Sequence, residues 1–180
     1  MDTIAALEQT FTHTSGVVAG VRADQLEDPT PCAEWTVRQL LEHMIGVVAG
    51  LGYAVGGNPP QEFVLGADPA AQFDGAAAAA LAAWRTPGVL DRIVDIRAGS
   101  MPGHAVASIN LLDTATHTWD LATATGQPPE LPERVAAAAL EASEQIVNPE
   151  LRNGRFGPEQ QAPAGASTTA RLVAFLGRTP

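Results

Sequence analysis

Apolar side chains recur at intervals of three and four residues through most of this 180-residue chain, and this spacing is the strongest constraint on its fold. One apolar stripe covers residues 4–21 and a second covers residues 37–51. Residues at such intervals share one face of an α-helix, and that face must be buried against another element. Thr36 and Gln39 have the spacing of a capping box, which places the start of the second helix. The pattern predicts two amphipathic helices in the N-terminal third of the chain.

Four further helices are expected downstream, and the sequence marks most of their ends. They are expected from Pro69 to about Thr86, from about Ser108 to Gly126, from Pro132 or Glu133 to Ile146, and from Thr168 to about Arg178. Asp68 has the position of an N-cap, and Gly126 has that of a glycine just after a helix. Residues 90–107 are expected to form an irregular or hairpin-like excursion, and residues 152–167 a surface loop. The sequence therefore predicts an all-α fold.

The composition limits the partners of this fold. A chain of 180 residues is within the usual range for one domain, so residues 1–180 are expected to form a single helical domain. The formal net charge is -10 and all ten basic residues are arginine, so we expect no basic surface for nucleic acid. The lone Cys32 excludes an internal disulfide, and no N-terminal stretch combines a basic leader with an apolar run. Neither secretion nor a membrane anchor is indicated, and a cytoplasmic location is expected.

Three residues have the spacing of a metal site with an open coordination position. Asp113 and His117 are four residues apart, so on a helix both side chains leave the same face. His43 belongs to an earlier helix that could approach them from the opposite side. Two imidazoles and one carboxylate leave one position of a tetrahedral zinc ion for water or substrate, which is typical of a reactive site. The less specific interpretation is that these histidines are only hydrogen-bonded or exposed.

Other residues near these motifs are expected to support the site. Asp120 is expected to pair with Arg38, because a guanidinium group can clamp a carboxylate and fix two helices in register. A solvated aspartate is the alternative. Trp35 and Trp119 are expected to pack near the site and to exclude water from it. Cys32 is interpreted as a buried structural thiol rather than a nucleophile, since no basic residue adjoins it in the sequence.

Two motifs carry a resemblance to a known family. Thr30-Pro-Cys-Ala-Glu-Trp-Thr-Val-Arg-Gln-Leu-Leu-Glu-His-Met-Ile-Gly46 and Asp113-x-x-x-His117-x-Trp-Asp-Leu-Ala-x-Ala-Thr-Gly126, together with the ending at residues 172–180, resemble actinobacterial metal-binding proteins of the DinB-like, or YfiT-like, superfamily. These proteins are related to the N-terminal domain of mycothiol-dependent maleylpyruvate isomerase. The resemblance implies an up-and-down four-helix bundle that binds a divalent metal, commonly zinc or nickel, near one end. It assigns the ligand positions to His43, Asp113 and His117, and it implies a link to thiol cofactors.

The chain departs from the isomerase pattern in two respects. Asp113 stands where the isomerase relatives have glutamate, and the shorter side chain reaches less far toward a metal. The isomerase also has an additional C-terminal domain that helps to shape its substrate site, for which 180 residues leave no space. The specific maleylpyruvate isomerase reaction is therefore not carried over to this chain.

Three functions of different classes agree with these observations. The favoured one is a transferase or isomerase in which the metal activates mycothiol, or another low-molecular-weight thiol, toward a small organic electrophile. The second is a metal-dependent hydrolase, and the third is a metal-stabilised binding bundle without catalysis. The expected partners are a small-molecule thiol and the electrophile, with a homodimer as one option for the assembly. Thiol-dependent consumption of an electrophile would separate the first function from the others.

Overall fold

The computed structural model describes residues 2–32, 35–58, 62–152 and 156–180, and these ranges are mainly helical. The α-helices are α1 (Thr3–Ala19), α2 (Val37–Val55), α3 (Pro69–Trp84), α4 (Gly103–Ala124), α5 (Glu133–Ile146), α6 (Pro149–Arg152) and α7 (Thr168–Phe175). A small antiparallel sheet pairs β1 (Ile93–Ile96) with β2 (Gly99–Pro102). The all-α fold and the short hairpin excursion that the sequence predicts are confirmed.

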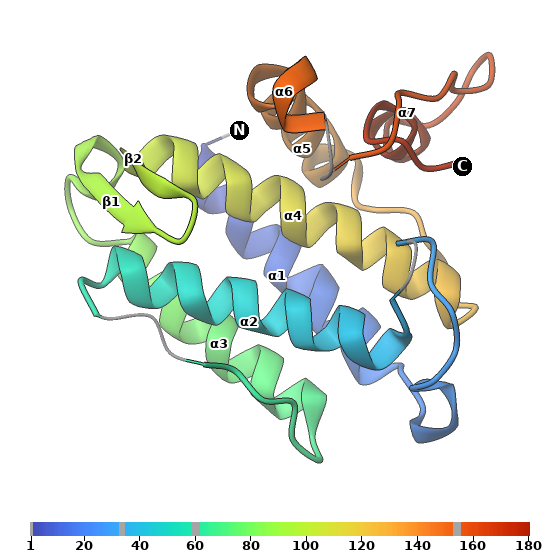
Figure 1. Ribbon diagram of the computed structural model, residues 1–180, viewed down its shortest axis with the longest axis horizontal. Helices are drawn as coiled ribbons and strands as arrows, with labels where there is room; N and C mark the ends of the chain where they lie inside the picture. The colour runs from blue at the N-terminus through green and yellow to red at the C-terminus, as the bar shows by residue number, and fades with distance from the viewer. Residues whose placement is uncertain (1, 33–34, 59–61, 153–155) are drawn as a thin grey trace.

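Helices α1 to α4 form a four-helix bundle around an apolar core (Figure 1). Helix α1 packs against α3 and α4, and α2 packs against the same two helices. Thr14 near the end of α1 is hydrogen-bonded to Thr118 near the end of α4, and Gly52 near the end of α2 contacts Ala80 near the end of α3. The helices therefore run up, down, down and up. The parallel pair α2 and α3 departs from strict alternation, so the chain between them returns to the end of the bundle at which α2 begins.

The predicted helix ends agree with the structure at several caps. The Thr36 hydroxyl accepts a hydrogen bond from the Gln39 backbone N–H, and the Gln39 side chain accepts one from the Thr36 backbone N–H. Asp68 accepts from the backbone N–H of Ala71 at the start of α3. Gly126 follows α4 with a φ of +70°, a conformation that costs glycine little. These local signals place α2, α3 and the end of α4.

Helix α4 begins earlier than the sequence analysis predicts. Its first residue is Gly103 rather than a residue near Ser108. The backbone N–H of Gly103 donates to the carbonyl of Arg92 at 2.7 Å, and a Cβ at Gly103 would collide with the carbonyl of Val89. Pro102 is the N-cap, where its missing N–H leaves no hydrogen bond unmade. Glycine and proline thus mark the start of this helix and not an irregular segment before it.

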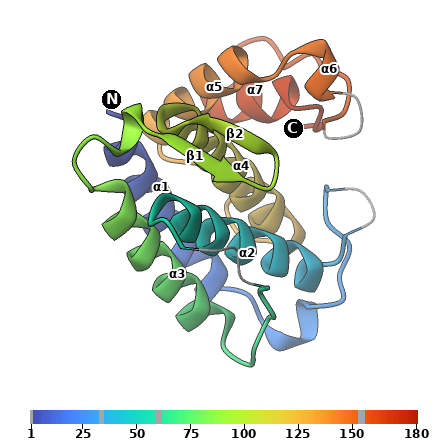
Figure 2. The ribbon, with the colours of Figure 1, turned by 60° about the vertical axis from the view of Figure 1, so that its left-hand side comes forward.

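Helix α4 lies between the other helices of the bundle and the C-terminal helices (Figure 2). Helix α5 packs against α4 on one side and α7 on the other, which covers the face of α4 that the bundle leaves free. All residues from Asn110 to Ala122 are buried except Asp113, which is partly exposed. Among the described residues, no helix is both long and apolar enough to cross a membrane. The middle of α4 thus places His117 in the interior and Asp113 one turn before it, where the helix is partly exposed.

Candidate metal centre and its cavity

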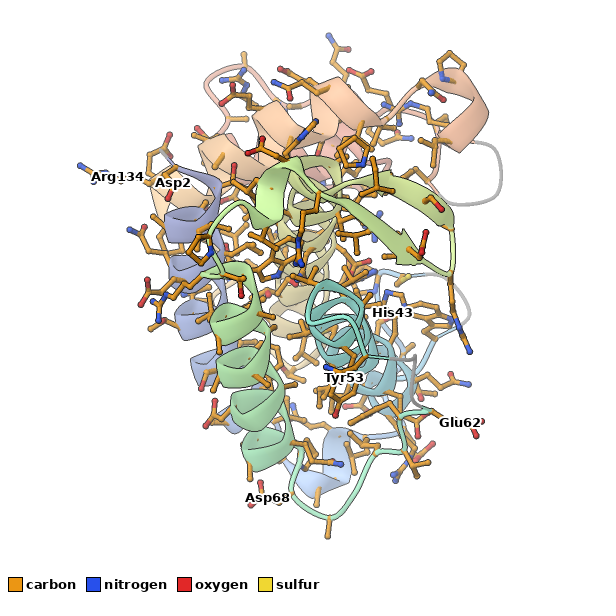
Figure 3. All side chains as sticks on the ribbon, turned by 90° about the vertical axis from the view of Figure 1, so that its left-hand side faces the viewer. Asp2, His43, Tyr53, Glu62, Asp68 and Arg134 are labelled. Atoms are coloured by element: carbon orange, nitrogen blue, oxygen red, sulfur yellow. The ribbon has the colours of Figure 1, made fainter. Side chains whose placement is uncertain are left out.

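The structure brings His43, Asp113 and His117 together. His43 comes from the first half of α2 (Figure 3), and Asp113 and His117 come from successive turns of α4. Oδ1 of Asp113 lies 3.2 Å from Nε2 of His43 and 3.7 Å from Nε2 of His117. Ligand atoms on a tetrahedral zinc ion, each 2.0–2.1 Å from the metal, lie about 3.3 Å from one another. The three side chains therefore have a spacing that one metal ion can satisfy, and Oδ1 of Asp113 lies close to both imidazoles without the extra methylene of a glutamate.

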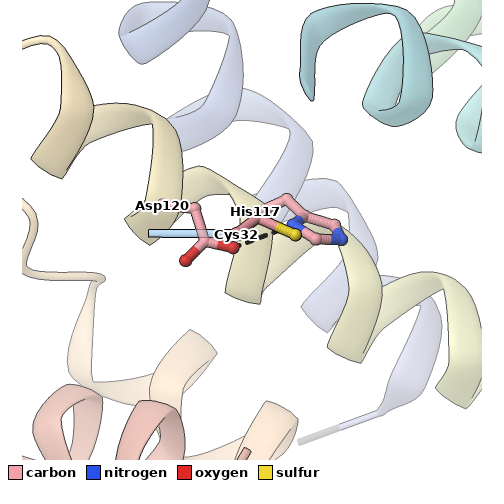
Figure 4. Close-up of side chains that lie close together, drawn as sticks. All are labelled: Cys32, His117 and Asp120. Carbon is pink, nitrogen blue, oxygen red and sulfur yellow. Dashed lines mark hydrogen bonds and ion pairs between the residues drawn. The ribbon is translucent and has the colours of Figure 1, made fainter. Parts of the chain in front are cut away.

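The hydrogen bonding of His117 adds a chemical reason for a cation at this point. Nδ1 of His117 lies 2.9 Å from Oδ2 of Asp120 (Figure 4), and a carboxylate only accepts, so this nitrogen carries the proton. A neutral His117 then directs the lone pair of Nε2 toward Oδ1 of Asp113. Two acceptors that face each other need a proton or a cation between them. Oδ2 of Asp113 is also buried and has no hydrogen-bond partner among the described residues, so the donor set fits a divalent metal.

Asp113 has the ionisation state that a metal ligand requires. Burial raises the pKa of its carboxyl group, but the positive charge of His117 in its protonated form and the hydrogen bond and charge of His43 lower it by more. The net result is a pKa below the usual value for aspartate. Asp113 is therefore a carboxylate at neutral pH and can coordinate a cation without first losing a proton.

Asp120 pairs with Arg178 rather than with the predicted Arg38. Nε and Nη2 of Arg178 donate to the two oxygens of Asp120 at 3.2 Å and 2.8 Å. Burial raises the pKa of Asp120, but the hydrogen bonds from His117 and Arg178 lower it by more. The pKa of Arg178 is raised, because the hydrogen bond and charge of Asp120 outweigh its burial. The side chain of Asp120 is fully buried, and this ion pair compensates its charge.

The predicted pairing of Arg38 is wrong for a geometric reason. Arg38 is exposed, and its Nε donates to Oε1 of Glu27 at 2.9 Å. It lies five residues before His43 on α2, which at 3.6 residues per turn places the two side chains about 140° apart around the helix. With His43 directed at α4, Arg38 is directed away from it. Arg38 consequently has no part in the site.

The two tryptophans differ in their relation to the site. The ring of Trp35 lies with its centroid 4.6 Å from that of His43 and 5.8 Å from that of His117. Trp35 thus packs against both imidazoles. Trp119 is buried on α4, but it does not line the cavity described below. Of the two tryptophans, only Trp35 lies beside the site, as the sequence analysis expects of both.

Cys32 lies at the edge of the site and not in the core. Its side chain is half-buried, and its sulfur lies within 4.8 Å of a ring nitrogen of His117 and a carboxylate oxygen of Asp120 (Figure 4). Burial raises the pKa of the thiol, and the negative charge of Asp120 raises it further. Cys32 is therefore mainly a neutral thiol at pH 7, which agrees with the view that it is no nucleophile.

A cavity of about 870 Å³ opens beside His43, Asp113 and His117. Its walls come from the segment before α2, the β1–β2 hairpin, α4, the region around α6, and the chain after α7. The apolar residues that line it are Pro31, Trp35, Ala98, Met101, Ile109, Leu112, Ile146, Leu151, Phe156 and Leu176. This volume is within the usual range for small-molecule sites, and the lining is mainly apolar with a polar group at one place.

Arg178 is the residue of this site that the sequence analysis misses. It follows α7 near the C-terminal end, and 58 positions separate it from Asp120. No local spacing connects the two residues. A chemical argument could have pointed to it. An aspartate that is buried on α4 needs a cation beside it, and in a chain without lysine the ten arginines are the side chains that stay positively charged at neutral pH.

Comparisons with known proteins agree with the fold and the motifs. The chain is 36% identical over 182 residues to uncharacterized proteins of Mycobacterium tuberculosis strains CDC 1551 / Oshkosh and ATCC 25618 / H37Rv, and the match covers 99% of this chain and 99% of each of those. Among solved structures it is similar to mycothiol-dependent maleylpyruvate isomerase, with a TM-score of 0.58 and 15% identity over 76% of this chain. A histidine-to-alanine mutant of that enzyme matches with a TM-score of 0.50 and 13% identity.

The likeness to the enzyme is one of fold, since the identity is low. The match covers 66% of the enzyme chain, so this chain spans just under two thirds of it. The family described as the mycothiol maleylpyruvate isomerase N-terminal domain matches residues 7–122, which include His43, Asp113 and His117. That match covers well over half of the chain and confirms the resemblance in the two motifs. The protein therefore belongs to the family of mycothiol maleylpyruvate isomerase N-terminal domains, within the DinB-like superfamily.

Proposed function

We propose that this protein binds one divalent metal, zinc or nickel, through His43, Asp113 and His117, and that it activates a low-molecular-weight thiol toward a small electrophile. The observation that carries the proposal is the arrangement of two imidazole nitrogens around one oxygen of Asp113 at the wall of an apolar cavity. Mixed nitrogen and oxygen ligands suit zinc and nickel. Three protein ligands leave a coordination position on the cavity side, which is accessible to a small molecule.

The charges around the site favour a singly negative ligand in that position. Arg178 neutralises Asp120, and Asp113 offsets one of the two charges of a divalent cation. The single positive charge that is left matches one thiolate. A divalent cation supplies the chemistry for this state, because coordination lowers the pKa of a thiol and holds it deprotonated at neutral pH.

The protein's own residues would orient the ligand and exclude water. Trp35 packs against the two imidazole rings, and Asp120 keeps the proton of His117 on Nδ1. The apolar walls favour an electrophile with little charge. Apart from His43, Asp113 and His117, the described lining of the cavity contains no imidazole or carboxylate that could act as a general base. Activation of a water molecule, as in a hydrolase, is therefore less well supported than activation of a thiol.

The cavity also supports the proposal that residues 1–180 act as one domain. The bundle supplies the three ligand residues, whereas Ile146, Leu151, Phe156 and Leu176 on the cavity wall come from the C-terminal part. Arg178 from the same part is ion-paired with Asp120 of α4. Neither part forms the complete cavity without the other.

The test is a comparison of thiol-dependent turnover in the wild type and in His43→Ala. Protein purified without a metal-affinity tag is loaded with zinc or nickel, and consumption of a small uncharged electrophile is followed with mycothiol or a cysteine-based analogue. We expect consumption above the uncatalysed rate that requires both the metal and the thiol and is absent in His43→Ala. Electrophile consumption without thiol would support a hydrolase. Metal binding without any turnover would support a binding bundle.

A further inference from the structure

The hydrogen bonds of His117 continue through Asp120 to Arg178, and these three residues form a connected chain. Oδ2 of Asp120 accepts from Nδ1 of His117 and from Nη2 of Arg178, at 2.9 Å and 2.8 Å. Oδ1 of Asp120 accepts from Nε of Arg178 at 3.2 Å. The guanidinium therefore contacts both oxygens of the carboxylate, in the fork geometry that fixes its plane.

This geometry determines which nitrogen of His117 faces Asp113. Asp120 is one helical turn after His117 on α4, so the shared helix fixes the distance between them but not the rotation of the carboxylate. Arg178 removes that rotation by holding both oxygens. With Oδ2 held against Nδ1, the proton of a neutral His117 stays on Nδ1. Nε2 is then the free acceptor, and it is the nitrogen that lies 3.7 Å from Asp113.

Arg178 is itself held in place by the chain around it. Its Nη1 donates to the carbonyl of Leu176, and its backbone N–H donates to the carbonyl of Val173 in α7. Gly177 has a φ of +87°, and a Cβ there would lie 2.6 Å from Cα of Gly157, so a side chain at Gly177 would not fit. The side chain of Arg178 is only 10% exposed. The guanidinium is thus positioned before any ligand binds.

We propose that Arg178 is a positioning residue for the metal ligand His117 and acts through Asp120. The inference rests on the proposed metal site, and it assigns a role in that site to the segment after α7. Supporting carboxylates that orient a ligating histidine typically change metal affinity by 10–100-fold when they are lost. Arg178 extends such support by one further residue.

The experiment compares Arg178→Gln, Arg178→Lys and the control Arg38→Gln, which breaks an exposed ion pair outside the site. Zinc affinity is measured by competition with a chelator of known affinity. We expect Arg178→Gln to lose roughly 10–100-fold in affinity, Arg178→Lys to lose less because it keeps a donor and a charge, and Arg38→Gln to match the wild type. Equal affinity of Arg178→Gln and the wild type would overturn the proposal.

A double-mutant cycle tests whether Arg178 acts through Asp120. In an Asp120→Ala background, Arg178→Gln should cause no further loss of zinc affinity, because the intermediate group is already missing. Full additivity of the two losses would show that Arg178 acts independently, which contradicts the proposal. Circular dichroism establishes that each variant is folded before its affinity is compared.

A metal-free measurement keeps the test independent of the proposed function. Nitrogen-15 spectra of the wild type and the variants are recorded without metal at about pH 8, where imidazoles are generally neutral. These spectra report which nitrogen of His117 carries the proton. We expect protonated Nδ1 in the wild type and in Arg38→Gln, and a mixture of tautomers in Arg178→Gln. Protonated Nε2 in the wild type would overturn the proposal even if no variant folds. A wild type that binds no metal would overturn the proposed function, and the tautomer would still decide the role of Arg178.

Discussion

Gly52 of α2 packs directly against Ala80 of α3, so closely that a Cβ at Gly52 would lie 2.9 Å from Cα of Ala80. The two parallel helices approach at this point because neither residue has a bulky side chain. Both Gly52 and Ala80 are buried, so no open space adjoins this contact. A close approach of two backbones leaves little room for relaxation.

We predict that Gly52→Ala destabilises the protein by about 1–3 kcal/mol, since the added methyl group forces α2 and α3 apart. The control is Gly50→Ala on the same helix, where an added Cβ would meet nothing within 4 Å. There, alanine should stabilise by roughly 0.5–1 kcal/mol through its higher helix propensity. Urea denaturation measures both changes. Destabilisation of similar size in the two variants would show that helix spacing does not explain the effect.

The second prediction concerns the buried pair of Asp120 and Arg178 in metal-free protein. Asp120→Asn should cost about 3–5 kcal/mol at pH 7, because it leaves the buried guanidinium without its counter-charge. The control Glu27→Gln breaks the exposed pair with Arg38 and should cost at most about 1 kcal/mol. Chemical denaturation of both variants at pH 7 provides the comparison.

The cost of Asp120→Asn should also depend on pH in a defined direction. The pKa of Asp120 is lower in the folded protein than in the unfolded chain. The ionised carboxylate therefore stabilises the fold above the unfolded pKa of about 3.9, and this stability is lost as the pH falls through the lower folded pKa. The difference in unfolding free energy between the wild type and Asp120→Asn should shrink below about pH 4. A difference that stays constant over this range would contradict the assignment.

The third prediction separates the metal from the fold. The wild type should bind about one zinc or nickel ion per chain, and His117→Ala should abolish binding, whereas the exposed His104→Ala should leave it unchanged. Removal of the metal should lower the melting temperature without loss of helical circular dichroism, because apolar helix faces hold the bundle. Elemental analysis and thermal melts measure these effects. A metal-free protein that is largely unfolded would show that the core alone does not hold the bundle.

The affinity for metal should also fall as the pH is lowered. Coordination requires neutral imidazoles, so protons compete with the metal at His43 and His117. A titration from about pH 7.5 to about pH 5.5 covers the range in which histidine generally gains a proton. The expected result is progressively weaker zinc binding toward the acidic end, and no dependence on pH would exclude histidine ligation.

The parts of this protein that the sequence predicts are those that depend on neighbours within a few residues. The caps at Thr36 and Asp68 follow from local hydrogen bonds, and the alignment of Asp113 with His117 follows from one helical turn. These features are determined by chain-local geometry. The approach of His43 to Asp113, 70 positions away, is not local, and the resemblance to the family predicted it.

The wrong or missing predictions concern contacts between distant segments. Arg38 has a local partner in Glu27, and Asp120 takes its cation from Arg178, which is 58 residues away. Helical periodicity leaves open whether Asp120 is buried or solvated, and it does not show which arginine the fold brings to it. The early start of α4 at Gly103 likewise depends on a contact with Val89, which no local pattern indicates.

The fourth prediction tests the proposed thiol. Cobalt-substituted protein should develop a sulfur-to-metal charge-transfer band when mycothiol or a cysteine-based analogue is added, because three protein ligands leave one position for the sulfur. Absorption spectroscopy should show no such band in His43→Ala.

Cys32 requires a control in this experiment, because its sulfur lies within 4.8 Å of a ring nitrogen of His117. A charge-transfer band that is present before thiol is added, and absent in Cys32→Ser, would come from the protein's own thiol. The measurement is therefore made in both the wild type and Cys32→Ser. A band that depends on added thiol and persists in Cys32→Ser places the external sulfur on the metal. If cobalt stays bound and neither protein responds to any low-molecular-weight thiol, the thiol-dependent function is wrong, and a hydrolase or a binding bundle takes its place.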